Sequence, residues 1–338
     1  MSLILLSAIT FFPGYLVLSI FFKNQLSRIP FFVALPLFFG MGLCIQILIS
    51  VLAGAYIIGL YVPLGITIAS VFGMGIYLVY KSRMDKKRGL FHLKMGYADR
   101  VLVRKNVFAL VLILFTFTYL ANLAIDKGWP PVGDAIMHST ITSKILNDGT
   151  SVHRQPFAPF PAVYPTGFHS FAANFSLFAN IFPGESIYLI ATFTLIIFSM
   201  LLFTLSYVLT NSFWLSLPST FSALVIHSSG QLERWIGGFL WNGPYPSLFA
   251  FTAVICALIF LELNYRRSKS FFTVLPVLTL IVVSLVVAYP NFVPHVLIFL
   301  LAYLIFRNTV TIKNYLLKFT KAVLFPLLNI RTDQGEVR

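Results

Sequence analysis

The sequence predicts an all-α fold, a polytopic bundle of about nine transmembrane helices with amphipathic interfacial helices in a long polar loop. The first observation is composition: 58% of the 338 residues are apolar and only 10% are charged, with a mean hydropathy of +0.88. A soluble chain of this length needs more polar surface, whereas a bilayer as solvent removes that demand. The second observation is that apolar residues form runs of about 20, the length of a bilayer-spanning helix.

The apolar runs lie on either side of a polar loop at residues 126–184. Those before the loop are 3–22, 31–53, 60–80 and 107–125, and those after it are 185–210, 213–229, 245–264, 271–289 and 291–306. We therefore expect four parts. They are N-terminal transmembrane helices in 1–125 with a basic loop at 81–106, the polar loop 126–184, C-terminal transmembrane helices in 185–313, and an interfacial helix with a polar tail in 314–338.

The basic residues predict which side of the membrane each loop faces. Loop 81–106 is rich in Lys and Arg, so the positive-inside rule places it in the cytoplasm. Alternation of the spans then puts 20 of the 24 basic residues inside, and it puts the N-terminus and loop 126–184 outside. The net charge of +14 is thus explained by membrane topology and gives no reason to expect a nucleic-acid partner. No basic residue precedes run 3–22, which favours a retained span over a cleaved signal peptide.

The outer loop predicts two short helices. The first covers Asp134–Asn147, where Met137, Ile141 and Ile145 form an apolar row at a spacing of four residues. The neighbouring row, at the same spacing, is polar and consists of Asp134, His138 and Thr142. The second helix begins around 164–167 and carries His169 and Asn174. We expect both helices to be amphipathic and interfacial, and the first to lie along the membrane surface with its polar row facing a cavity.

Asp134, His138 and His169 are the candidate catalytic residues. Asp134 and His138 are neighbours at i, i+4, and a carboxylate and an imidazole are the usual groups for removing a proton from a hydroxyl. Asp134 and His138 are also candidate ligands for a divalent metal ion, although two ligands alone are weak evidence. The structural alternatives stay open: Asp134 as a helix cap, and the two histidines as ordinary hydrogen-bonding residues at an interface.

A second set of outer residues suits a phosphate group. Lys144, Arg154 and Arg234 are the well-separated outer cations, and such groups position a phosphate and stabilise its charge as it leaves. The secondary candidates are Asp126, Glu233 and Tyr164. Structural alternatives exist here too: Arg234 pairs with Glu233 or reaches the interface as a lone charge, and Asp126 ends a span.

Two segments of the outer loop resemble a known enzyme class. Gly133-Asp134-x-x-x-His138, followed by the Tyr164–His169 segment with its Tyr-Pro-x-Gly-x-His pattern, is similar to polytopic GT-C-type glycosyltransferases, closest to poorly characterised microbial members. The resemblance implies transfer of a sugar from a polyprenyl-phosphate carrier to a glycan, lipid or protein acceptor at the outer membrane face. It also implies that Asp134, or Asp126 in second place, is the key acid. The chain lacks the adjacent acidic pair that would favour metal dependence.

Two other function classes remain. A transporter or flippase of lipid-linked glycans should carry ionisable groups in mid-membrane or broken helices, and the predicted spans contain few charges. A non-catalytic membrane subunit that supports assembly is the third. Sugar transfer by a membrane enzyme is the leading hypothesis.

Overall fold

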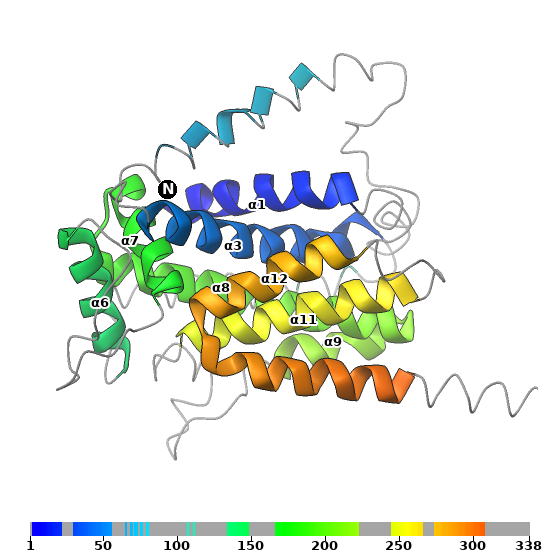
Figure 1. Ribbon diagram of the computed structural model, residues 1–338. Helices are drawn as coiled ribbons and strands as arrows, with labels where there is room; N and C mark the ends of the chain where they lie inside the picture. Colours follow the sequence, from blue (N-terminus) through cyan, green and yellow to red (C-terminus); the bar gives the residue numbers. More distant parts are fainter. Residues whose placement is uncertain are drawn as a thin grey trace, which may run out of the picture. The chain divides into compact units, whose positions relative to one another are not determined.

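The structure is a computed structural model that describes residues 2–21, 30–55, 134–148, 166–222, 245–265 and 274–307, together with scattered positions between 65 and 111. Its regular elements there are all helical (Figure 1): α1 (Ser2–Phe21), α3 (Phe31–Ala55), α6 (Asp134–Asp148), α7 (Gly167–Ala179), α8 (Pro183–Thr210), α9 (Phe213–Ser222), α11 (Tyr245–Tyr265), α12 (Leu275–Ala288) and the 3-10 turn η4 (Pro290–Phe292), followed by a helical segment to residue 307. The predicted all-α class is confirmed. The chain divides into two units, Met1–Val293 and Pro294–Arg338.

Five helical segments of the described chain are long and apolar enough to cross a membrane: Ser2–Phe21, Val33–Leu52, Pro183–Thr210, Tyr245–Tyr265 and Pro290–Arg307. They match five predicted runs and support an integral membrane protein. The predicted run 271–289 contains α12, which is shorter. Most of runs 60–80 and 107–125, all of 223–244 and the segment 314–338 lie outside the described residues, so the count of about nine stays a prediction.

Helices α1 and α3 pack closely because glycines line their contact. A Cβ atom at Gly42 would collide with the backbone oxygen of Thr10, and one at Gly14 would collide with the backbone oxygen of Phe38. Small residues allow this approach in membrane proteins, where van der Waals packing replaces hydrophobic association. Gln46 donates from Nε2 to the backbone oxygen of Ile9 over 2.7 Å, which adds a buried hydrogen bond between the two helices.

Helix α8 runs through the centre of the first unit and contacts α3, α6, α7, α9 and α11. Most of its residues are buried, as expected for a helix that is apolar on all sides. Thr204 donates a hydrogen bond from Oγ1 to the backbone oxygen of Val33 at 3.0 Å. Phe39 of α3 meets Phe193 of α8 edge to face, with ring centroids 5.7 Å apart. Aromatic and polar contacts therefore both join α8 to α3.

Four helix ends meet around α6 and α7 at one end of the first unit (Figure 1). These are the C-terminal parts of α3 and α12 and the N-terminal ends of α8 and α11. The contacts are Asn174 with Ser50, Ser186 with the backbone oxygen of Ala172, Gly167 against Val287, and His138 beside Tyr245. The predicted alternation of spans assigns all four ends to the outer side. The structure brings them together, and the side of the membrane they face stays a prediction.

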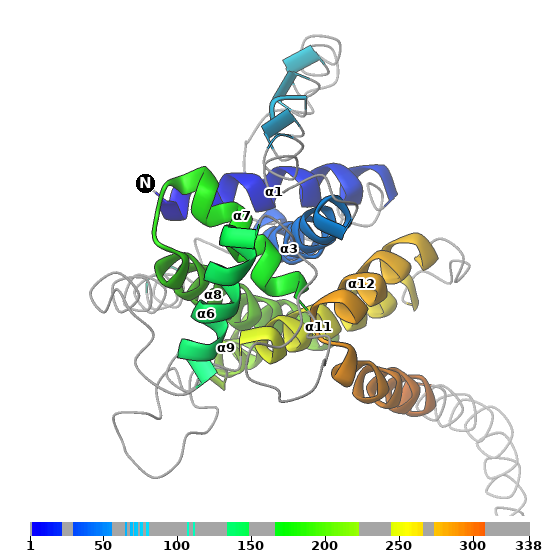
Figure 2. The ribbon, with the colours of Figure 1, turned by 60° about the vertical axis from the view of Figure 1, so that its left-hand side comes forward.

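The two loop helices are present, and they differ from each other. Helix α6 has exposed residues such as Ile136 and Lys144 on one side, while Ile141 and Ile145 are buried on the other. Helix α7 is buried over its first ten residues, because its apolar and small side chains are covered by α3, α6 and α8 (Figure 2). That part of α7 therefore has no exposed face. An interfacial position of the two helices stays a prediction.

We predict that Gly42→Ala destabilises the protein by about 2 kcal/mol. Overpacking typically costs 1–3 kcal/mol, and here the obstacle is backbone, which cannot rotate away. The measurement is the midpoint temperature of thermal unfolding in detergent, with the loss of monodisperse protein as the signal. Gly73→Ala is the control, because nothing lies within 4 Å of its added Cβ. Equal midpoints for the two variants would show that α1 and α3 do not depend on this close approach.

Candidate functional site

Helix α6 is held against α7 and α8 by its apolar row. Ile141 and Ile145 form a buried cluster with Ala173 of α7, and Met137 packs against its edge. This packing turns the neighbouring polar row toward α7 as well, because rows at i and i+4 are adjacent on a helix. As a result His138 and Thr142 are buried together with the isoleucines.

His138 and His169 meet between the two helices. His138 Nδ1 lies 2.7 Å from His169 Nε2, within the range of a hydrogen bond, and the ring centroids are 4.9 Å apart. The exposed fraction is 3% for His138 and 0% for His169. The ring of Tyr245, at the start of α11, lies 5.7 Å from that of His138. Two of the three predicted catalytic residues, 31 positions apart in sequence, therefore form a buried pair.

Burial lowers the pKa of His169 well below its ordinary value, and electrostatic repulsion between the two imidazoles, when both are protonated, lowers it further. Removing an imidazolium from water costs free energy, so burial favours the neutral ring. A neutral imidazole has one N–H donor and one nitrogen that accepts. His169 is therefore a neutral ring, with one nitrogen that donates a hydrogen bond and one that accepts.

Buried polar atoms on the same helices that have no hydrogen-bond partner among the residues that the structure describes include Ser139 Oγ, Ser170 Oγ and Asn174 Oδ1. Each serine directly follows one of the paired histidines. A buried group without a partner costs about 1–3 kcal/mol, so such atoms in a native protein call for an explanation. Sequence reasoning missed both serines, and their position beside the histidines was the available signal.

Asp134 and Lys144 lie apart on the exposed side of α6. Asp134 is its first residue and is exposed, one turn before the buried His138. Lys144 is also exposed, and ten residues at about 1.5 Å each place it roughly 15 Å further along the helix. The other predicted residues, Arg154, Arg234, Asp126, Glu233 and Tyr164, lie outside the described residues. The structure thus pairs two predicted site residues and separates Lys144 from Asp134.

The metal hypothesis for Asp134 and His138 stays a prediction. Within the described ranges, no group of three or more His, Cys, Asp or Glu side chains could hold a metal ion. Two imidazole nitrogens on one tetrahedral zinc ion would lie about 3.3 Å apart, given bonds of about 2.0 Å. The observed 2.7 Å is shorter and fits a direct hydrogen bond.

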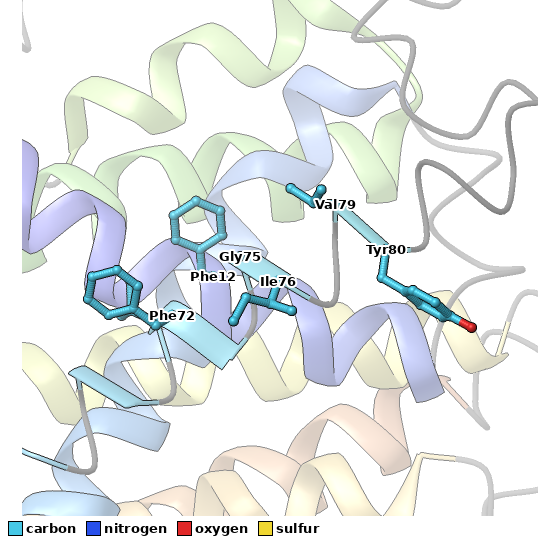
Figure 3. Close-up of a pocket in the computed structure, with 7 residues that line it drawn as sticks. Phe12, Phe72, Gly75, Ile76, Val79 and Tyr80 are labelled. Atoms are coloured by element: carbon cyan, nitrogen blue, oxygen red, sulfur yellow. The ribbon is translucent and has the colours of Figure 1, made fainter.

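A separate pocket of about 580 Å³ lies beside α1 (Figure 3). Phe12 forms one side, and residues between 71 and 80, including Phe72, Ile76 and Tyr80, form the other. None of its lining residues carries a charge, so its chemistry suits hydrocarbon and not proton transfer. The histidines do not contribute to it.

Comparisons with protein-family models, curated proteins and solved structures return no match.

We predict that the wild-type protein loses about 1 kcal/mol more stability than His169→Gln when the pH falls from 7.5 to 5.5. The folded state holds His169 neutral, so the unfolded state binds more protons below its pKa of about 6.5. Stability from this group is fully present above that value and is lost as the pH falls below it. Thermal midpoints of the two proteins in detergent, measured across this range, test the sign. Parallel pH profiles would contradict the assignment of a neutral His169.

Proposed function

We propose that this protein transfers a sugar from a polyprenyl-phosphate carrier to an acceptor hydroxyl at the outer membrane face. The observation that carries the proposal is the 2.7 Å contact between His138 and His169. It joins the two loop segments whose motifs resemble GT-C enzymes. An exposed acid, Asp134, begins the helix one turn before the pair. Five apolar helices of spanning length supply the membrane setting that a lipid-linked donor needs.

The reaction needs a base on the acceptor side. The acceptor O–H bond breaks, its proton passes to a base, and the oxygen forms a bond to the anomeric carbon of the sugar. The bond between that carbon and the phosphate oxygen breaks, and its electron pair leaves with the carrier phosphate. The first turns of α6 present two groups able to take the proton, the exposed Asp134 and the buried His138. In this proposal the exposed Asp134 binds the acceptor, and His138 lies one turn further along the helix.

The leaving phosphate needs cations or hydrogen-bond donors. Lys144 is poorly placed for a phosphate held near Asp134, given the separation of the two residues along α6. Arg154 and Arg234 are candidate phosphate-binding residues on the basis of the sequence alone. In sequence, Arg234 precedes Tyr245, the residue whose ring lies beside His138. Arg234 is therefore the first of the two arginines to test as a phosphate-binding residue.

Two features favour a flippase of lipid-linked glycans as the second candidate function. Glu262 is completely buried within α11, and ionisable residues inside spans are often functional. The backbone also leaves helical geometry at Tyr289, between α12 and the 3-10 turn η4, and broken helices are common at transport sites.

We predict that Asp134→Asn and His138→Gln each lower sugar transfer by about 10²–10⁴-fold, the usual contribution of a general base or its partner. The assay supplies the purified full-length protein with a polyprenyl-phosphate sugar and measures the new glycosidic bond. Thr140→Ala is the matched control, because Thr140 is exposed on α6 and its hydroxyl donates to the backbone oxygen of Ile136 in the same helix. Full activity of Asp134→Asn would remove Asp134 from the mechanism.

Reconstituted vesicles separate the two candidate functions. Donor lipid is supplied on the side that is outside in the predicted topology, and both product and lipid movement are followed. We expect product to form without translocation of the donor. Transbilayer movement with no new glycosidic bond would instead identify a flippase.

A further inference from the structure

The contact between the two histidines holds a single proton. Two ring nitrogens at 2.7 Å repel each other if both are bare, and two N–H groups facing each other would clash. One nitrogen therefore donates and the other accepts. Only two arrangements exist: His138 Nδ1–H donates to His169 Nε2, or His169 Nε2–H donates to His138 Nδ1.

The two rings are not equivalent in their surroundings. His169 has no exposed surface and belongs to the part of α7 that is buried on all sides. His138 lies on α6, which has an exposed side, and it contacts the first residue of α11. Of the two rings, His138 is therefore the one that a substrate entering from the α6 side reaches first.

Only one arrangement lets His138 act as a base. If His169 donates, a neutral His138 carries its hydrogen on Nε2 and has no lone pair for a substrate. If His138 donates from Nδ1, its Nε2 carries no hydrogen and can take a proton. The Nδ1–H bond then stays in place while the ring becomes charged, and charge-assisted hydrogen bonds are roughly twice as strong as neutral ones.

We propose that His169 is a positioning residue, which accepts the Nδ1–H of His138 and so keeps the hydrogen of the neutral His138 ring on Nδ1, leaving a lone pair on Nε2 for the proton of the acceptor hydroxyl. The proposal rests on the proposed sugar transfer. His138 Nε2 takes the proton released when the acceptor O–H bond breaks, the acceptor oxygen bonds to the anomeric carbon, and the carrier phosphate leaves. His169 keeps its own proton throughout. Partners of this kind set the tautomer of functional histidines in other sites.

The proposal is tested directly by ¹⁵N NMR of the full-length protein, labelled at histidine and held in detergent micelles. The ¹⁵N shift distinguishes an imidazole N–H from a bare nitrogen, and His138→Gln and His169→Gln assign the signals. We expect Nδ1 to carry the hydrogen in both rings and Nε2 to carry none. N–H at both Nε2 positions would overturn the proposal. This result does not depend on which reaction the protein catalyses.

The kinetic test compares two substitutions of similar size. Gln at position 169 places an amide oxygen near the position of Nε2 and can accept the Nδ1–H, whereas Leu offers no acceptor. We expect His169→Gln to lose less than tenfold in transfer rate and His169→Leu to lose about 10²-fold or more. Equal rates for the two variants, with equal amounts of folded protein, would overturn the proposal.

The two tests separate the inference from the proposed function. The expected NMR pattern can be found while neither the wild-type protein nor any variant transfers a sugar. In that case the histidine arrangement holds and the sugar-transfer function fails. If His169→Leu does not fold, the NMR pattern of the wild-type protein decides the inference alone.

Discussion

Hydrogen bonds buried between helices hold this bundle in one arrangement. Apolar packing between lipid-facing helices is weakly directional, whereas a polar group in hydrocarbon must find a partner. Gln46 bonds α3 to the backbone of α1, and Thr204 bonds α8 to the backbone of α3. Each such bond contributes only about 0.6 kcal/mol on average in a membrane protein. Their value lies in specifying register, since a sliding helix would leave several of them without partners at once.

The same principle positions the candidate site. Helix α7 is too short to span a membrane, and it is enclosed instead by α3, α6 and α8. Ser50 and Asn174 join it to α3 over 3.4 Å, and Ser186 bonds from α8 to the backbone oxygen of Ala172 over 2.6 Å. These contacts fix α7 from two sides, so that His169 meets His138 from the third. The histidine pair is thus the last in a series of buried polar contacts that begins at α1.

Much of the fold follows from the sequence, because a bilayer leaves few choices. Run length predicts α1, α3, α8 and α11, and the period of four residues predicts α6. What period and composition do not predict is which faces meet. Asp134 and His138 belong to one row, yet the helix start exposes the first and packing buries the second. The pairing of His138 with His169 depends on how α7 packs against α6, which is a property of the tertiary structure. The burial of α7 was missed for the same reason.

A neutral histidine as the partner of a histidine base has a physical consequence. A carboxylate in this place would strongly raise the basicity of His138 but would itself need solvation or further partners, because a buried charge is costly. His169 is completely buried, and a neutral acceptor avoids that cost. The exposed Asp134, one turn away, can then contribute negative charge from the solvent side without being buried. The two roles are thus separate: the charged Asp134 lies at the surface and the neutral partner His169 lies inside. This separation agrees with the exposure of Asp134 on α6 and the burial of His169 on α7.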